Sequence, residues 1–162
     1  MNYSIYTDGA CSNNGAKDAR GGFAFVVLDD KGNHRYEYSK HVENATNNIC
    51  ELSAVFGACS FFDAYSPEGN MATIYSDSAY IINCITQKWY KKWQTNGWRN
   101  AKKEPVANRE LWERLIPYFE NPRFSFEKVK GHSGEKDWND YVDKLAVEAK
   151  EEKCDYSGHP YL

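Results

Sequence analysis

The sequence predicts an α/β fold in which helices cover the faces of a mixed β-sheet. Three strand-like segments come first along the chain, and helices then alternate with two further strands. The 162 residues are the usual length of one domain and are long enough to enclose a core. Hydrophobic residues (41%) and charged residues (27%) occur in the proportions of an ordinary globular protein, with no internal repeat or low-complexity segment.

The first three segments read as strands joined by turns. Residues 2–8 (NYSIYTD) are mostly apolar and end in a carboxylate, and residues 22–28 (GFAFVVL) have the continuous apolar character of a buried strand. Residues 34–40 alternate tyrosines with polar side chains after the polar turn 29–32, which is typical of a partly exposed hairpin partner.

The remainder of the chain alternates helices and strands. Thr46 has the character of a helix cap, because its side-chain oxygen can accept a hydrogen bond from an otherwise unpaired amide. Pro117 is expected to weaken the end of its helix. The expected elements are a helix over 47–61, a strand over 71–76, a helix from Asp77 through Ile85, a helical or loop-like segment over 88–104, a helix over 108–119, a strand over 124–130, a helix over about 137–152 and a loose tail from Tyr156 to Leu162.

The charge is distributed unevenly. The net charge is −3 and the pI is about 5.8, which taken alone argues against a nucleic-acid partner. Between Lys88 and Arg109, however, Glu104 is the single acid among the lysines and arginines, and the segment is about six charges positive. A polyanion responds to such a local concentration of charge, although a solvated lysine face would have the same composition.

The cysteines and the ends of the chain suggest a location. The five cysteines are odd in number and include no CxxC pair, so neither a disulfide framework nor a thiolate metal site is indicated. No apolar run approaches a membrane span, and residues 1–8 lack the features of a secretory signal. We therefore expect a cytoplasmic protein.

Four carboxylates occupy places where a carboxylate is unexpected. Asp8 and Asp77 each end a largely apolar strand, and they would lie side by side if those strands were parallel neighbours. Glu51 shares a helix face with Val55 and Ala58. The fourth acid, Asp143, lies against Ala146 and Val147, with Asn139 one turn earlier on the same side.

Such a set of acids suits a hard cation. Carboxylates brought together away from water either take up protons or bind cations, and oxygen ligands without cysteine favour Mg²⁺ or Mn²⁺. Two such ions can hold the attacking and leaving oxygens of a phosphoryl displacement. Each acid alone is more often a turn, cap or surface residue, and Asp77 could simply cap its helix. The prediction depends on the whole set.

Five motifs, in order along residues 2–150, resemble the signatures of type 1 ribonucleases H of the bacterial, stand-alone kind. No single motif is specific, but all five in order are. The matching segments are Tyr6-Thr7-Asp8-Gly9-Ala10, Thr46-Asn47-Asn48-Ile49-Cys50-Glu51-Leu52, Tyr75-Ser76-Asp77-Ser78-Ala79-Tyr80, Lys130-Gly131-His132-Ser133-Gly134, and Asn139 to Asp143 followed by Lys144-Leu145-Ala146.

The resemblance implies a fold and a reaction. It implies the ribonuclease H-like fold, a five-stranded mixed sheet flanked by helices, over residues 1–153, with residues 154–162 as a tail. It implies an endoribonuclease that cuts the RNA strand of RNA–DNA hybrids with two Mg²⁺ ions, for which Mn²⁺ can substitute, leaving 5′-phosphate and 3′-hydroxyl ends. Asp8, Glu51, Asp77 and Asp143 would be the metal ligands, and His132 would assist proton transfer or product departure, which suits a group that titrates near neutral pH. Without its Lys-Gly and Ser-Gly neighbours, His132 would read equally well as a plain loop residue.

The resemblance also implies a substrate surface. Residues 88–107 match the basic protrusion of the family, where lysines can meet phosphates of the DNA strand and tryptophans can pack on sugars or bases. Some tryptophans could instead anchor the protrusion to the core, and for Trp112 we favour that role. The matching positions are Thr46 and Asn108 for a DNA phosphate; Asn14, Asn47 and Asn48 for RNA and its hydroxyls; and, with Gly9, the protrusion residues Trp89, Lys91, Lys92, Trp93, Trp98, Lys102 and Lys103.

Three alternatives remain at this point. A recombination nuclease or integrase could share the fold, but the basic protrusion and the Thr46-Asn47-Asn48 segment argue against it. A catalytically silent hybrid-binding module would not need all four acids. A domain of a polyprotein such as a reverse transcriptase is a third alternative, and the start at Met1 together with the protrusion favours a free enzyme. We expect a monomer.

Overall fold

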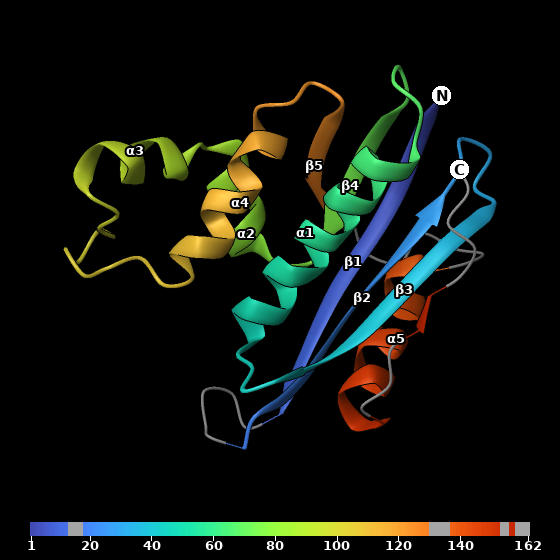
Figure 1. The fold of residues 1–162 in the computed structure, drawn as a ribbon, viewed down its shortest axis with the longest axis horizontal. Coiled ribbons are helices and arrows are strands. Elements are labelled where there is room, and N and C mark those ends of the chain that lie inside the picture. The colour runs from blue at the N-terminus through green and yellow to red at the C-terminus, as the bar shows by residue number, and fades with distance from the viewer. Residues whose placement is uncertain (13–17, 130–136, 153–155, 158–162) are drawn as a thin grey trace.

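A twisted sheet forms the centre of the protein, and helices lie on both of its faces (Figure 1). The computed structural model describes residues 1–12, 18–129, 137–152 and 156–157. The strands are β1 (Asn2–Ser12), β2 (Arg20–Leu28), β3 (His34–Glu43), β4 (Met71–Ser76), β5 (Phe124–Lys128) and β6 (Tyr156–Ser157). The helices are α1 (Asn47–Tyr65), α2 (Ala79–Thr86), α3 (Trp89–Asn96), α4 (Arg109–Phe119) and α5 (Trp138–Glu152).

The sheet is mixed, and the predicted α/β fold is confirmed. Its strand order within the described residues is β5-β4-β1-β2-β3-β6. β1 pairs antiparallel with β2, and β2 pairs antiparallel with β3. On the side of β1 away from β2, β4 pairs parallel with β1, and β5 pairs parallel with β4. The predicted approach of Asp8 and Asp77 depended on β1 and β4 being parallel neighbours, and they are.

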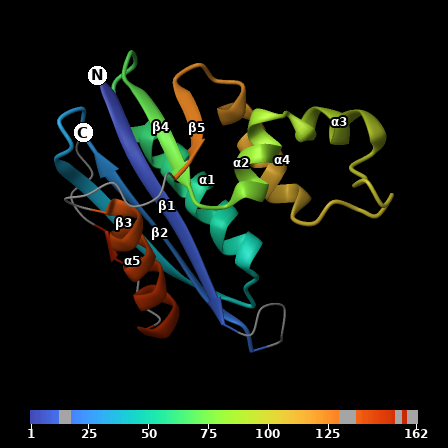
Figure 2. The same cartoon turned by 180° about the vertical axis from the view of Figure 1, so that it is seen from behind.

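Successive side chains of the central strands alternate between two cores. Phe25 and Val27 of β2 join the larger core with α1, whereas Ala24 and Val26 pack under α5 with Val142. This burial on both faces explains the continuous apolar run of β2. Figure 2 shows α5 lying across β1, β2 and β3 on the face opposite α1.

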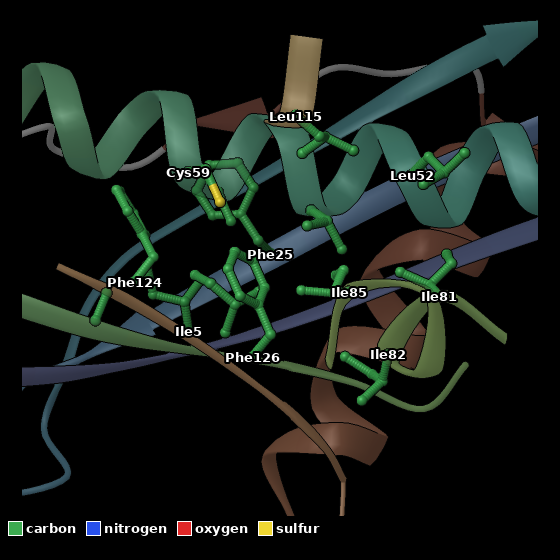
Figure 3. Packing of buried hydrophobic residues seen from close by; sticks show 14 of the residues in the cluster. Ile5, Phe25, Leu52, Cys59, Ile81, Ile82, Ile85, Leu115, Phe124 and Phe126 are labelled. Atoms are coloured by element: carbon green, nitrogen blue, oxygen red, sulfur yellow. The ribbon is translucent and has the colours of Figure 1, made fainter. Parts of the chain in front are cut away.

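The larger core joins the sheet to α1, α2 and α4 (Figure 3). Ile5 of β1 and Phe25 of β2 meet Leu52 and Cys59 on the inner face of α1. Leu115 of α4 and the three isoleucines of α2 continue the same core toward β5. Because helix and sheet are packed this closely, the ends of β1, β4 and α1 have fixed relative positions.

Several boundaries differ from those expected from the sequence. Ser78, and not Asp77, caps α2, because its Oγ accepts the Ile81 amide at 3.3 Å. The end of α4 is as expected, because the helix continues through Pro117 to Phe119. Tyr156 and Ser157 were expected in a loose tail, but they pair with Ser39 and Tyr38 as a short edge strand. Among the described helices, none combines the length and the apolar character that crossing a bilayer requires.

Candidate metal centre and nucleic-acid surface

Asp8 and Asp77 lie side by side because their strands are parallel and in register. Tyr6 of β1 is paired with Tyr75 of β4, and each acid follows two residues later. The Thr7 hydroxyl donates to the Tyr75 carbonyl at 2.8 Å and ties the two strands together just before the acids. Since Ser78 caps α2, the Asp77 carboxylate is not needed as a cap.

Glu51 reaches the same place from the first turns of α1. Thr46 caps this helix, because its Oγ1 accepts the Ile49 amide at 3.1 Å. The helix backbone then lies directly on Gly9, where an added Cβ would come within 2.6 Å of the Glu51 nitrogen. Glycine at this position therefore allows Glu51 to approach Asp8 so closely.

Asp143 comes from α5, on the other face of the sheet. This helix lies directly on β2, where a Cβ at Gly22 would come within 2.4 Å of the Ala146 carbonyl. The Asp143 carboxyl interacts with that of Asp8, although Asp143 as a whole is exposed. Asp8, Glu51, Asp77 and Asp143 are called the acidic centre below.

The geometry of the acidic centre fits a bound cation. Carboxylate oxygens of Asp8, Glu51 and Asp77 all lie within 4.8 Å of one another. Asp8 is only 3% exposed, and Glu51 Oε2 is buried with no hydrogen-bond partner among the described residues. A buried carboxylate oxygen without a donor is unfavourable, and a divalent cation would satisfy it.

The electrostatics point in the same direction. Burial raises the pKa of Asp8, and the neighbouring Glu51 carboxyl raises it further. Burial followed by the charge of Asp77 raises the pKa of Glu51, and burial followed by the charge of Asp143 raises that of Asp77. Without a cation, the centre therefore holds its protons more firmly than ordinary carboxyls do.

Asn139 lies one helical turn before Asp143 in α5, although it was not among the predicted site residues. Its Oδ1 is buried and has no partner among the described residues. The signal in the sequence was its position one helical turn before Asp143, which places both side chains on one face of α5. A carbonyl oxygen at this position could add a neutral oxygen to the acidic centre.

The tryptophans of the basic protrusion (residues 88–107) serve mainly internal packing. Trp93 and Trp98 are 6% and 7% exposed and lie with their ring centres 5.8 Å apart. Trp112 is fully buried against Trp93, as favoured from the sequence, and the Arg109 guanidinium lies 5.1 Å above the Trp98 ring. The flat faces of Trp93 and Trp98 are therefore not available for stacking on a nucleic acid in this arrangement.

The lysines of the basic protrusion point outward. Lys91, Lys92, Lys102 and Lys103 are all exposed. Lys92 and the half-buried Trp89 line a pocket of about 530 Å³ together with Tyr80, Trp93, Asn96, Arg99, Asn100 and Ala101. The protrusion therefore presents a basic surface that includes partly exposed aromatic rings.

The other predicted substrate residues lie on two elements. Asn47 and Asn48 are exposed at the start of α1, next to the capping residue Thr46. Asn108 precedes α4 and makes no capping hydrogen bond with its side chain. Asn14 and His132 lie outside the described residues.

A larger groove lies elsewhere. It measures about 660 Å³ and runs between α1 and the strands β2 and β3, lined by Phe25, Tyr38 and Phe56 among others. None of the four acids of the acidic centre lines this groove, so the two sites are separate.

Comparisons with known proteins agree with this arrangement. The RNase H family model matches residues 1–151. The Ribonuclease H of Clostridium botulinum (strain Hall) is 45% identical over 148 residues, which cover 91% of this chain and 95% of that protein. The Ribonuclease H of Syntrophomonas wolfei is 46% identical over 145 residues, covering 90% of this chain and 93% of that protein.

Solved structures share the fold. LC9-RNase H1, a type 1 RNase H with the type 2 active-site motif, superimposes with a TM-score of 0.77 at 24% identity, covering 95% of this chain and 74% of that one. LC11-RNase H1 in complex with RNA/DNA hybrid gives a TM-score of 0.70 at 22% identity, covering 93% and 97%. At these identities the structural likeness supports the fold alone. Membership of a family is shown by the family model and by the two bacterial relatives, because they match this chain in sequence over most of its length. This chain belongs to the RNase H family.

Proposed function

We propose that this protein hydrolyses the RNA strand of RNA–DNA hybrids, using divalent metal ions held by the acidic centre. The observation that carries the proposal is the clustering of Asp8, Glu51 and Asp77 within 4.8 Å, with a buried oxygen of Glu51 left without a donor. The membership of the RNase H family identifies the reaction class.

The acidic centre would hold two Mg²⁺ ions, and Mn²⁺ could replace them. Bound there, such ions would lower the pKa of an attacking water and stabilise charge on the departing oxygen. The carboxylates of Asp8, Glu51, Asp77 and Asp143 would be their ligands. Water adds to the phosphorus, the bond to the 3′-oxygen breaks, and the products carry 5′-phosphate and 3′-hydroxyl ends.

The surface near the acidic centre is proposed to distinguish the two strands. Asn14, Asn47 and Asn48 would contact RNA and its 2′-hydroxyls, which separate RNA from DNA at a given position. Thr46 would hold a DNA phosphate, because its hydroxyl still has a proton to donate while its oxygen caps α1. Asn108 is available for the same strand because its side chain is not used as a cap.

The basic protrusion is proposed to bind the DNA strand beyond the cleavage site. Lys91, Lys92, Lys102 and Lys103 would meet phosphates, and the half-buried Trp89 would pack against sugar or base. Trp93 and Trp98 would contribute by holding the protrusion in shape. His132 would assist proton transfer or product departure, so His132→Ala should slow cleavage without abolishing it.

Three further expectations complete the proposal. Residues 1–153 would form the ribonuclease domain, including the basic protrusion, with residues 154–162 as a C-terminal extension from which Tyr156 and Ser157 add the short strand β6 to the sheet. The protein would act as a monomer. It would work in the cytoplasm, where the free cysteines Cys11, Cys50, Cys59 and Cys84 would stay reduced.

A cleavage assay tests the proposal. Labelled RNA–DNA hybrid, duplex RNA and duplex DNA of one sequence are each incubated with the protein, with Mg²⁺ or with a chelator. We expect cleavage of the RNA strand of the hybrid only, in Mg²⁺ only, with little sequence preference, because phosphate and sugar contacts carry little base information.

The control is Asp77→Asn prepared in the same way, which excludes a contaminating nuclease. Equal cleavage of duplex DNA, or cleavage in the chelator, would contradict the proposal. Binding of the hybrid without cleavage in either Mg²⁺ or Mn²⁺ would favour the silent binding module.

A further inference from the structure

A buried glutamate of β3 joins the sheet to the first turn of α5. Glu37 of β3 is only 7% exposed. The Tyr141 hydroxyl donates to its Oε1 at 2.6 Å, and Nε2 of His34 lies 2.8 Å from the same oxygen. Hydrogen bonds to a carboxylate away from water are short and strong, so this contact holds α5 firmly to β3.

Ring packing supports the same contact. The His34 ring stacks on Trp138 with centres 5.8 Å apart, and the edge of Trp138 meets Tyr141 at 5.2 Å. Trp138 is the first residue of α5, and Tyr141 follows one turn later. Glu37, His34, Trp138 and Tyr141 together are called the α5 clamp.

The α5 clamp lies across the helix from Asp143. Val142 is fully buried between α5 and the sheet, and successive helical residues are about 100° apart. Tyr141 and Asp143 therefore lie on opposite flanks of Val142, one toward β3 and the other toward Asp8. A rotation of the first turn about the helix axis would move both side chains together.

Asp143 needs such support because its neighbours in the acidic centre are themselves acids. The groups that face it there are Asp8, Glu51 and Asp77, all of which are carboxyls. None of these three groups offers Asp143 an opposite charge. Its position must then come from the backbone of α5 that carries it.

We propose that Glu37 and Tyr141 are positioning residues, which hold the first turn of α5 at the rotation that presents Asp143 to the metal ions. This inference rests on the proposed function, because it assumes that the acidic centre binds those ions. It assigns a role in the reaction to two residues that touch neither the ions nor the substrate.

The test measures Mn²⁺ binding to the free protein by electron paramagnetic resonance. Tyr141→Phe removes the hydroxyl and keeps the ring, and Glu37→Leu removes its acceptor. Each should weaken Mn²⁺ binding by about tenfold, the lower range of the effect found for residues that orient metal ligands. The double variant should bind no more weakly than Glu37→Leu alone, since that change already removes the contact that Tyr141→Phe removes.

Two further variants separate positioning from general stability. Glu37→Gln retains an acceptor oxygen for the Tyr141 hydroxyl and should keep most of the wild-type affinity for Mn²⁺. Tyr118→Phe is the matched control, because it removes a tyrosine hydroxyl that bonds Ser60 far from α5. It should lower the melting temperature as Tyr141→Phe does, with unchanged Mn²⁺ affinity. In cleavage assays, Tyr141→Phe should raise the Mg²⁺ requirement and leave the KM for hybrid unchanged.

The outcomes of the two proposals are distinct. Unchanged Mn²⁺ affinity in Tyr141→Phe, while Asp8→Asn loses binding, would overturn the positioning role and leave the metal centre intact. Unchanged binding in Asp8→Asn would overturn the metal centre itself. Equal losses in Tyr141→Phe and Tyr118→Phe would assign the effect to stability and would also overturn the positioning role.

Discussion

The acidic centre and the basic protrusion both gather like charges, and they do so by different means. The acids come from β1, α1, the residue after β4, and α5, and the fold brings them together around the buried Asp8, with Glu51 partly buried and Asp77 and Asp143 exposed. The lysines follow one another along a single segment and remain exposed. Charges that must act on a metal ion are assembled by the tertiary structure, whereas charges that meet a solvated polyanion can be supplied by local composition.

The two regions also differ in what holds them in place. The acidic centre is braced by close backbone packing at Gly9 and Gly22. The basic protrusion is anchored to the larger core by Trp93, which packs on both Trp98 and Trp112, and the Val106 amide donates to the Trp98 carbonyl at 2.9 Å. The raised pKa values of Asp8, Glu51 and Asp77 show that the acidic centre carries electrostatic strain. Substitutions in the two regions should therefore differ in kind.

The largest effect is expected in the acidic centre. Asp8→Asn or Asp77→Asn should abolish cleavage of the hybrid, because each removes a charge that holds the metal and leaves the packing in place. Cleavage of labelled hybrid in Mg²⁺ measures the loss, and circular dichroism checks the fold. Near wild-type activity in a folded variant would mean that the site is wrongly assigned.

A smaller effect, of another kind, is expected in the basic protrusion. Neutralising Lys91, Lys92, Lys102 and Lys103 together should raise the KM and leave saturated turnover nearly unchanged, because these lysines would act in binding. Each lost phosphate contact should reduce the slope of log affinity against log salt by about 0.7–0.9. Titration of hybrid in Ca²⁺ at several salt concentrations measures that slope. If it stays the same, the lysines form a solvated face and the capture of substrate has another explanation.

The tryptophans should separate packing from contact with substrate. Trp93→Ala should lower the free energy of unfolding by about 3–5 kcal/mol, as expected for deleting a large buried ring, and should weaken hybrid binding indirectly. Trp89→Ala should weaken hybrid binding by at most about 1–3 kcal/mol, which is the contribution of one base stacked on an aromatic ring. It should change the stability and the salt slope little. Urea denaturation beside the binding titration measures both quantities. If Trp93→Ala instead weakened hybrid binding with little change in stability, the face of the Trp93 ring would lie at the substrate.

The smallest effect concerns the pH dependence of stability without metal. The pKa of Asp8 is raised to about 10 in the folded protein, so its contribution to stability is complete below about pH 4 and is lost progressively as the pH rises from there to the folded value. In chelator, Asp8→Asn should therefore be about as stable as the wild type at pH 5 and more stable at pH 8. A difference of one pH unit in a pKa corresponds to about 1.4 kcal/mol. Equal stability differences at both pH values would show that Asp8 is not strained.

Much of the acidic centre could be predicted from the sequence, because its signals are local. A carboxylate after an apolar run is visible at Asp8 and at Asp77, and the faces of Glu51 and Asp143 follow from helical spacing. The expected end of the first strand at Asp8 was wrong, because β1 continues to Ser12 and Asp8 pairs with Ala24 inside it. The sequence predicts that Asp8 and Asp77 approach each other only if β1 and β4 are parallel neighbours. The parallel pairing of Tyr6 with Tyr75 meets this condition. Asn139 was noticed on the right face, but the isolation of its Oδ1 depends on tertiary packing.

The basic protrusion shows where prediction from the sequence ends. Its charge can be read from composition, but whether a tryptophan is buried depends on partners distant in the chain. Trp93 is buried because Trp112 of α4 lies against it, and no local pattern reveals that contact. The α5 clamp is similar, since Glu37 and Tyr141 are 104 residues apart. The edge strand β6 escaped notice because two residues carry too little periodicity.

The most direct test of the metal centre places sulfur at the scissile phosphate. Hybrid is prepared with one non-bridging oxygen of each RNA phosphate replaced by sulfur, each isomer separately, and its cleavage is compared with that of ordinary hybrid. Mg²⁺ is a hard ion that binds sulfur poorly, whereas Mn²⁺ accepts it more readily. If the acidic centre holds ions that contact the reacting phosphate, at least one isomer should resist cleavage in Mg²⁺ and be cut in Mn²⁺. Equal rates for the ordinary hybrid and both sulfur isomers in Mg²⁺ would contradict direct metal contact with that phosphate.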